Sequence, residues 1–128
     1  MKDVRVLVVE DDMIIVMELK AKLEDFGYTV PATFSNGKEA IENISDIDPD
    51  IVLMDIRLKG SMNGIETARG IKDNTDIPII YLTALGDKDT MKRASQTKPF
   101  GIIRKPFDDD ELNSMIKSAV EKHRKTKR

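Results

Sequence analysis

The sequence contains no cysteine and no long hydrophobic run. Without cysteine, disulfide frameworks, thiol catalysis and cysteine-ligated zinc are excluded. No apolar stretch approaches the roughly 20 residues of a membrane span, and the start, "MKDVRVLVV", lacks the pattern of a signal peptide. At 128 residues, one domain can bury a core without disulfides or a structural metal. We therefore expect a cytoplasmic protein with no membrane contact.

The net charge of −2 is small, but charge is unevenly distributed along the chain. The last eight residues, "EKHRKTKR", hold five of the 21 basic residues and one of the 23 acidic residues, which leaves 16 basic and 22 acidic residues, or −6, for residues 1–120. A basic end can contact nucleic acid or a membrane, or it can be a solvated helix end whose cations favour the negative pole of the helix dipole. We favour the second interpretation and expect no direct contact with nucleic acid.

We predict one domain over residues 1–122 and a basic C-terminal tail over residues 123–128. The single histidine, His123, falls in this charged run. A phosphotransfer role for it would need an exposed helix bundle that the sequence pattern does not indicate. We therefore interpret His123 as a tail residue.

Five apolar stretches have the length of β-strands. Most are rich in β-branched residues and continuous rather than alternating, which is typical of strands covered on both faces in a parallel sheet. The stretch "YTVPATF" is weaker, and its Pro31 indicates an edge strand. The predicted strands are residues 4–9, 28–34, 51–54, 77–82 and 100–104.

The segments between these strands carry helical patterns. Apolar residues recur at helical spacing after Asp12 and predict a helix that stops near Gly27. Asn36 is expected to cap a second helix, and Asp108 followed by Glu111 resembles the capping box of a last one. Two more helices are predicted over residues 64–73 and 87–96, the latter mostly polar and exposed. Strands and helices that alternate in this way predict an α/β fold, with a doubly wound five-stranded parallel sheet and five helices.

Polar side chains follow the predicted strands at the point where each strand ends. Glu10 and Asp11 end the first strand, Asp55 the third, Thr83 the fourth and Lys105 the fifth. In doubly wound sheets, sites form outside the carboxyl ends of the strands. We therefore expect three carboxylates, one hydroxyl and one ammonium group to converge in one crevice.

The three carboxylates predict a site for Mg²⁺ and phosphoryl transfer. Carboxylates about 4 Å apart repel each other by roughly 4 kcal/mol at an effective dielectric constant near 20, and a hard divalent cation bound through oxygen removes this cost. An aspartate can act as a nucleophile and form an acyl phosphate, while a metal, a lysine and a hydroxyl stabilise the charge of the transferring group. Asp55 is the candidate nucleophile, because the strand order 2-1-3-4-5 makes its strand central. We interpret Asp12 as a helix cap.

Four motifs, "VLVVEDD", "DIVLMDIRL", "YLTA" and "RKPF", occur in the order and at the spacing of one protein family. Over about residues 3–120 the chain resembles the response-regulator receiver domains of two-component signalling, and in particular the chemotaxis-regulator type. The resemblance implies a flavodoxin-like fold and a Mg²⁺ cofactor held by the acidic pair, Glu10 and Asp11, with Asp11 as the direct ligand.

The resemblance also implies the roles of the remaining site residues. Asp55 matches the phospho-acceptor, which also faces the metal, and Arg57 falls where the family provides a backbone carbonyl to the metal. Thr83 matches the switch hydroxyl, and Lys105 matches the lysine that pairs with the phosphoryl group. The peptide bond between Lys105 and Pro106 is expected to be cis.

The implied function is signalling rather than turnover of an outside substrate. The chain would accept a phosphoryl group from the phosphohistidine of a histidine kinase or phosphotransfer protein, and it could form a homodimer through the face of its fourth helix, fifth strand and fifth helix. Two alternatives remain open. A pseudo-receiver would act only through protein interaction. A phosphatase with an aspartate nucleophile would resemble a strand ending in Asp-x-Asp, but Arg57 occupies the position of the second acid.

The sequence departs from the family pattern at two places. Ile102, three residues before Lys105, stands where many receivers carry Tyr or Phe. Strand periodicity puts Phe100 on the same face as Ile102, unless Pro99 places Phe100 outside the strand. Gly64 lies nine residues beyond Asp55, one more than is common, so we interpret residues 59–63 as containing one insertion, with Gly60 supplying flexibility.

Leu85, two residues beyond Thr83, leads to a prediction about the lifetime of the acyl phosphate. In the family this position tunes that lifetime, and a leucine side chain offers no group that orients an attacking water molecule. We expect slow hydrolysis, measured as loss of the phosphoryl group after removal of the donor. A half-life of seconds would contradict this expectation.

Overall fold

The computed structural model describes residues 3–58, 60–84 and 87–126. Within these residues, strands and helices alternate strictly, as the sequence predicts. The strands are β1 (Val6–Val9), β2 (Thr33–Phe34), β3 (Ile51–Asp55), β4 (Ile79–Thr83) and β5 (Gly101–Arg104). The helices are α1 (Met13–Asp25), α2 (Gly37–Ile47), α3 (Gly64–Asn74), α4 (Lys88–Gln96) and α5 (Asp109–Thr126).

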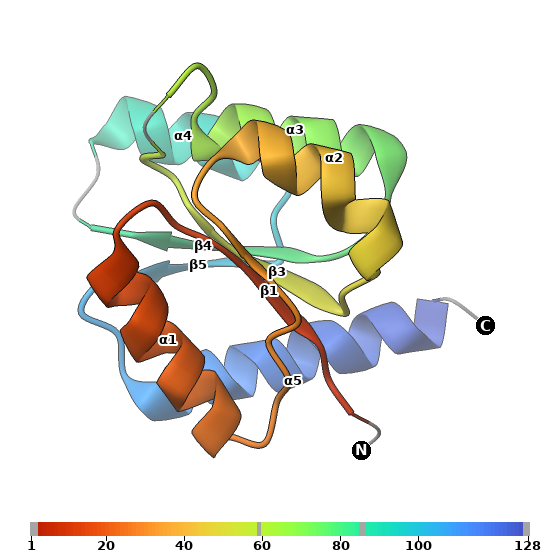
Figure 1. Cartoon of the computed structure of the whole chain (residues 1–128). Helices are drawn as coiled ribbons and strands as arrows, with labels where there is room; N and C mark the ends of the chain where they lie inside the picture. The colour runs from red at the N-terminus through yellow and green to blue at the C-terminus, as the bar shows by residue number, and fades with distance from the viewer. Residues whose placement is uncertain (1–2, 59, 85–86, 127–128) are drawn as a thin grey trace.

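The five strands form one parallel sheet in the order β2-β1-β3-β4-β5. Helices α1 and α5 cover one face of the sheet, and α2, α3 and α4 cover the other (Figure 1). The predicted fold class and strand order are therefore confirmed. All strands point the same way, so their carboxyl ends meet along one edge of the sheet.

The core has two layers, one on each face of the sheet. Along β1, Val6 and Val8 belong to the layer under α1 and α5, while Leu7 and Val9 belong to the layer under α2, α3 and α4. All four side chains are fully buried. Because successive strand residues point to opposite faces, a strand covered on both faces needs an unbroken apolar run, which explains the pattern in the sequence.

The strand boundaries differ from the prediction by a few residues. The expected edge strand over residues 28–34 is reduced to Thr33–Phe34, preceded by an isolated bridge between Arg5 and Thr29. Pro31 lies between these two pairings and has no N–H to donate. β4 begins at Ile79, directly after Pro78. β5 begins at Gly101, two residues after Pro99.

Polar side chains begin several helices. Asp12 accepts a hydrogen bond from the N–H of Ile14 at 3.0 Å, so its interpretation as a cap is confirmed. Asn36 caps α2 through the N–H of Glu39 at 3.0 Å, as predicted. At Asp108 the backbone carbonyl accepts from Leu112, and capping by its side chain stays a prediction.

The interpretation of His123 as a tail residue is wrong. Helix α5 continues through this position to Thr126, and the His123 side chain is buried with Nε2 3.2 Å from Oδ1 of Asp76. The helical stripe that buries Ala119 and Val120 therefore extends one turn further than the charged run indicates. The domain boundary after residue 122 stays a prediction. Among the described helices, none is both long and apolar enough to cross a membrane.

Candidate functional site

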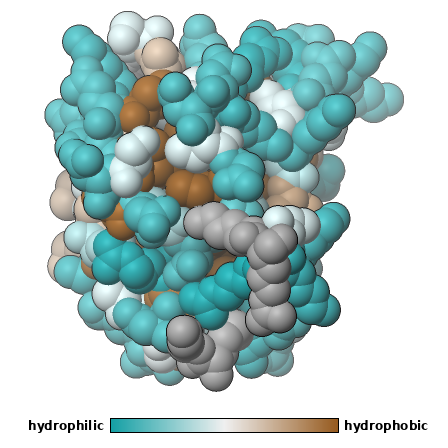
Figure 2. All heavy atoms as spheres, turned by 90° about the vertical axis from the view of Figure 1, so that its right-hand side faces the viewer, coloured by the Kyte–Doolittle hydropathy of each residue, from teal (hydrophilic) through white to brown (hydrophobic). Residues whose placement is uncertain are grey.

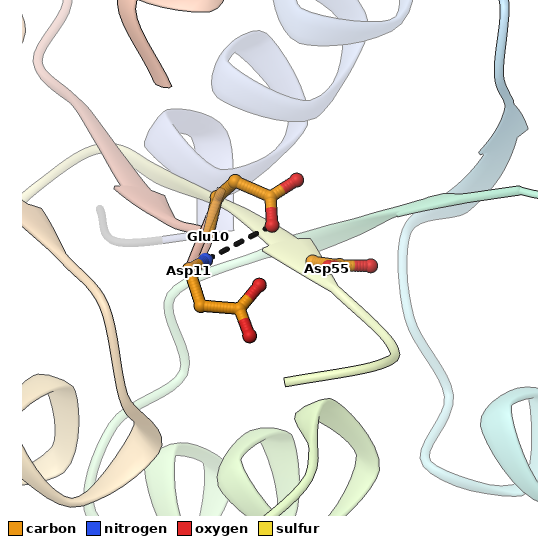
Figure 3. Close-up of side chains that lie close together, drawn as sticks. All are labelled: Glu10, Asp11 and Asp55. Atoms are coloured by element: carbon orange, nitrogen blue, oxygen red, sulfur yellow. Dashed lines mark hydrogen bonds between the residues drawn. The ribbon is translucent and has the colours of Figure 1, made fainter. Parts of the chain in front are cut away.

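Three carboxylates meet at the carboxyl ends of β1 and β3. Glu10 and Asp11 follow the last residue of β1, and Asp55 is the last residue of β3. Each offers an oxygen atom within 4.8 Å of the other two, and Figure 3 shows the pair from β1 beside the single acid from β3. The predicted convergence of these three groups is thus found in the structure.

Glu10 is the most deeply buried of the three acids, with 3% of its surface exposed. Its Oε2 accepts hydrogen bonds from the N–H groups of Asp11 at 2.9 Å and Asp12 at 3.4 Å; the first is the dashed line in Figure 3. Its Oε1 accepts from Nζ of Lys105 at 3.0 Å. Two backbone donors and an ammonium group therefore fix this carboxylate in one orientation.

Lys105 brings a positive charge to the acids from β5, the strand at one edge of the sheet. It follows β5, and its Nζ lies 3.0 Å from Oε1 of Glu10 and 3.9 Å from Oδ1 of Asp55. Its backbone N–H donates to the carbonyl of Thr83 at 2.7 Å, and the bond to Pro106 is cis, as expected. One ammonium group thus lies between carboxylates of two different strands.

Burial raises the pKa of Glu10 to about 7, and the neighbouring Asp55 carboxylate adds to this effect, while Lys105 opposes it. The favourable interaction with Lys105 therefore does not offset the combined effect of burial and of Asp55. Near neutral pH, Glu10 is poised between its protonated and ionised forms, and any additional cation favours the ionised form.

The loop after Asp55 passes very close to its backbone. The N–H of Gly64, at the start of α3, donates to the carbonyl of Ile56 at 2.9 Å. A Cβ atom on Gly64 would lie 2.0 Å from the backbone oxygen of Asp55, so only glycine fits at this position. The first residues of α3 hold this approach, because Asn63 and Glu66 form a capping box. This capping box was not predicted from the sequence, where its signal is Asn63 followed three residues later by Glu66.

Thr83 and Arg57 lie at the same end of the sheet as the acids. Their predicted roles, toward a phosphoryl group and a metal ion, stay predictions. Thr83 is buried at the end of β4, and its hydroxyl donates to the carbonyl of Ala84 at 2.8 Å. The backbone N–H of Arg57 donates to Oδ1 of Asp55 at 3.2 Å. The Arg57 carbonyl as a metal ligand stays a prediction. Lys59, in the predicted loop insertion, lies outside the described residues. So does Leu85, on which the prediction of slow acyl-phosphate hydrolysis rests.

Ile102 and Phe100 pack on opposite faces of the sheet, so the shared face expected from strand periodicity is wrong, and the alternative that Pro99 places Phe100 outside the strand is confirmed. Ile102 is half-buried against the layer under α2, α3 and α4, and Phe100 packs against the layer under α1 and α5. Strand periodicity fails here because β5 begins only at Gly101. Gly60 has a φ of 106°, which agrees with its predicted conformational role.

Three exposed apolar side chains were missed by the sequence reasoning. Met13, Ile14 and Met17 are 60%, 70% and 69% exposed on the first turns of α1. They lie outside the buried stripe of this helix, which includes Leu19 and Leu23. The sequence could have indicated this exposure, because these apolar residues lie outside the helical stripe that is expected to be buried.

A family model for the response regulator receiver domain matches residues 6–117. The chain belongs to this family. The receiver domain is 33% identical over 120 residues to the transcriptional regulatory protein PdtaR of Mycobacterium tuberculosis, a match that covers 94% of this chain and 58% of PdtaR. It is 37% identical over 115 residues to the transcriptional regulatory protein CrdR of Helicobacter pylori, with 88% and 53% covered. The chain thus spans little more than half the length of these relatives.

Solved receiver domains have the same fold. The signal receiver domain of a modulated diguanylate cyclase from Desulfovibrio desulfuricans G20 matches with a TM-score of 0.91 and 38% identity, over 96% of this chain and 98% of that one. The receiver domain of the sensor histidine kinase PA1611 from Pseudomonas aeruginosa PAO1 matches with a TM-score of 0.84 and 26% identity, over 93% and 98%. That structure holds a magnesium ion in its active site cleft.

The donor set of this receiver domain fits Mg²⁺, whose binding is typical of the family. Mg²⁺ prefers oxygen ligands and is usually held by one or two carboxylates with several waters. Glu10, Asp11 and Asp55 supply only oxygen ligands, from two adjacent strand ends. Burial and the neighbouring Asp55 carboxylate both disfavour ionised Glu10, and a bound cation would offset both effects.

The raised pKa of Glu10 predicts that Mg²⁺ binding depends on pH. Below about pH 7 the Glu10 carboxyl is largely protonated in the metal-free protein, and binding has to displace this proton. The apparent affinity for Mg²⁺ should therefore rise with pH up to about pH 7 and then level off. Titration calorimetry with Mg²⁺ between about pH 5 and pH 8 checks this.

The matched control is Glu10→Gln, which keeps the size of the side chain and does not titrate, although its NH2 group replaces one of the two oxygens that accept from Lys105 and from the backbone. In this variant the affinity should be weaker and should vary less with pH. An unchanged pH profile in Glu10→Gln would show that a different group is responsible.

The metal-free receiver domain should also change stability over the same range. Because the folded pKa of Glu10 lies above its ordinary value, the folded state binds more protons than the unfolded state between about pH 4.5 and pH 7. The free energy of unfolding contributed by this group therefore falls as pH rises through that range.

Proposed function

We propose that this chain accepts a phosphoryl group from the phosphohistidine of a histidine kinase or phosphotransfer protein onto Asp55, with Mg²⁺ as cofactor. The observation that carries the proposal is the position of Asp55, a buried carboxylate at a strand end with the Lys105 ammonium 3.9 Å away and two further acids within 4.8 Å. A nucleophile, a fixed positive charge and a set of metal ligands are the parts that phosphoryl transfer to a carboxylate needs.

In the proposed reaction an Oδ atom of Asp55 bonds to phosphorus while the phosphorus–nitrogen bond of the phosphohistidine breaks. The bonding electron pair stays on the imidazole nitrogen, and the product on Asp55 is an acyl phosphate. The Arg57 N–H, which donates to Oδ1 at 3.2 Å, orients the carboxylate for this attack. The Lys105 ammonium group stabilises charge on the transferring oxygens.

Mg²⁺, when bound, would neutralise charge shared between the carboxylates and the phosphoryl oxygens. Glu10 and Asp11 would hold it together with Asp55 and the backbone carbonyl of Arg57. Because Oε2 of Glu10 already accepts hydrogen bonds from two backbone N–H groups, the Glu10 carboxylate is not free to turn toward a metal ion. This supports Asp11, which is more exposed, as the direct ligand.

Phosphorylation would then alter the binding of partners. The Thr83 hydroxyl, which donates to the Ala84 carbonyl, would turn to the new phosphoryl oxygens. Ile102 is too small to repeat the rotation of an aromatic ring at this position, so the change would be transmitted through smaller shifts of β4 and β5. A homodimer through the face of α4, β5 and α5 stays a prediction, as do the expected absence of nucleic-acid contact and the cytoplasmic location.

The exposed apolar residues of α1 support a protein as the donor. Met13, Ile14 and Met17 lie on the first turns of α1, which begins shortly after β1 ends, so a partner helix packed on them would lie toward the same end of the sheet as Asp55. Apolar side chains that cluster at the surface commonly mark protein contacts.

A pseudo-receiver that only binds partners remains the alternative, because Ile102 departs from the usual switch residue. The complete set of Asp55, Lys105 and two further acids favours the active receiver.

Intact mass measurement after incubation with Mg²⁺ and a small acyl-phosphate donor distinguishes an active receiver from a pseudo-receiver. One added phosphoryl group is expected, because the nucleophile, cation site and lysine are all present. The addition should disappear in Asp55→Asn and in the presence of a chelator. Absence of any addition under excess donor would favour the pseudo-receiver.

Substitution of Ile14 tests the proposed donor surface. Ile14 is 70% exposed, so Ile14→Ser should leave the fold and the reaction with a small donor unchanged. Phosphotransfer from a phosphorylated histidine kinase should slow by about tenfold, because one buried apolar contact is worth roughly 1–2 kcal/mol. Lys20→Ser, at an exposed position of the same helix, is the matched control. Equal rates in both variants would contradict the proposed surface.

A further inference from the structure

A second pocket lies at the opposite end of the sheet from Asp55. It has a volume of about 440 Å³ and is bounded by the residues that lead into β4 and β5 and by the last turns of α5. This volume falls within the range of about 300–1,000 Å³ that is usual for small-molecule sites. The face from which the end of α5 projects in Figure 1 is largely hydrophilic, with small apolar areas between polar side chains (Figure 2). The pocket shares no lining residue with the acidic cluster.

The charged groups of the pocket are predominantly positive. Lys72, Lys98 and Lys122 line it, and none of their ammonium groups has a carboxylate partner among the described residues. The carboxylate of Asp76 also lines the pocket and lies 3.2 Å from Nε2 of His123. Three ammonium groups and one carboxylate leave a net charge of +2 when the imidazole is neutral.

Lys72 and Lys98 are held close to each other. The ammonium group of Lys72 donates a hydrogen bond to the backbone carbonyl of Lys98. Burial, and to a smaller extent the charge of Lys98, lowers the pKa of Lys72 below its usual range. Lys72 is partly buried and Lys98 is exposed, and their like charges oppose each other in the absence of a counter-charge. An anion between them would remove this unfavourable interaction.

The remaining wall of the pocket is apolar. Ile77, Pro78 and Phe100 line it beside the charged groups, and Ala119 closes it from α5. Phe100 is only partly buried by the core layer under α1 and α5. The pocket therefore combines an anion-binding rim with a surface that suits an apolar or aromatic group.

We propose that this pocket binds a small organic phosphomonoester, with the phosphate at Lys72, Lys98 and Lys122 and the organic group against Phe100 and Pro78. The charge of −2 on a phosphomonoester balances the net +2 of the lining groups. Lysine ammonium groups bind phosphate as point charges and donate several hydrogen bonds each. The proposal is independent of the reaction at Asp55, and either can fail without the other.

Binding of phenyl phosphate to the full chain, followed by amide chemical shifts at low ionic strength, tests this proposal. Inorganic phosphate and phenol are the two comparison ligands. Phenyl phosphate should cause saturable shifts around Ile77, Phe100 and His123 and should bind at least about tenfold more tightly than either comparison ligand. Asp55→Asn should not change this binding, because the acidic cluster is at the other end of the strands.

Two triple variants with the same change in net charge provide the control. Lys72→Gln, Lys98→Gln and Lys122→Gln together should weaken binding by roughly tenfold or more. Lys20→Gln, Lys38→Gln and Lys117→Gln, at exposed positions elsewhere, should change it less than about twofold. Equal loss in both triple variants, no saturable shift at the pocket, or equally tight binding of inorganic phosphate would overturn the proposal.

Discussion

The repulsion among Glu10, Asp11 and Asp55 is the constraint on which the rest of the site depends. The parallel register pairs Val9 with Met54, so the next residues along the two strands are Glu10 and Asp55. Carboxylates within 4.8 Å of one another are held together by the sheet and not by their own interactions. Each ionised pair costs roughly 3–4 kcal/mol at an effective dielectric constant near 20. A fold that holds such a cluster gains a strong preference for a cation at that point.

Lys105 relieves this repulsion only in part, and the incomplete compensation is useful. The ammonium group lies between Glu10 and Asp55 and is itself positioned from β5, so the charged groups come from the ends of three strands. The carbonyl of Thr83, at the end of β4, accepts from the Lys105 backbone N–H. Burial is the main cause of the raised pKa of Glu10, and the Asp55 carboxylate adds to it. Three carboxylates and one ammonium group leave this cluster with more negative than positive groups. In the proposed function, this excess attracts Mg²⁺ and, through it, a phosphoryl group that would otherwise be repelled by the acids.

Much of this site could be predicted from the sequence because strand ends in a parallel sheet are near one another whatever the details of side-chain packing. Glu10, Asp55 and Lys105 needed only the right strands and strand order. The close approach of Gly64 to Asp55 could not be predicted in this way, because it depends on the path of the loop between them. The burial of His123 could not be predicted either, because it depends on contacts with a segment far away in the sequence. At His123 a local run of charge concealed a helical stripe, which only the packed position of α5 reveals.

The most direct test of the account is the free energy of unfolding of the original chain and of Asp11→Asn, each measured in chelator and in excess Mg²⁺. Asparagine keeps the shape of the side chain and removes one negative charge. If repulsion dominates the metal-free site, the variant should be more stable than the original chain in chelator, by about 0.5–1 kcal/mol after screening by solvent, and Mg²⁺ should stabilise only the original chain. A variant that is less stable in chelator, or that gains as much from Mg²⁺ as the original chain, would contradict the account.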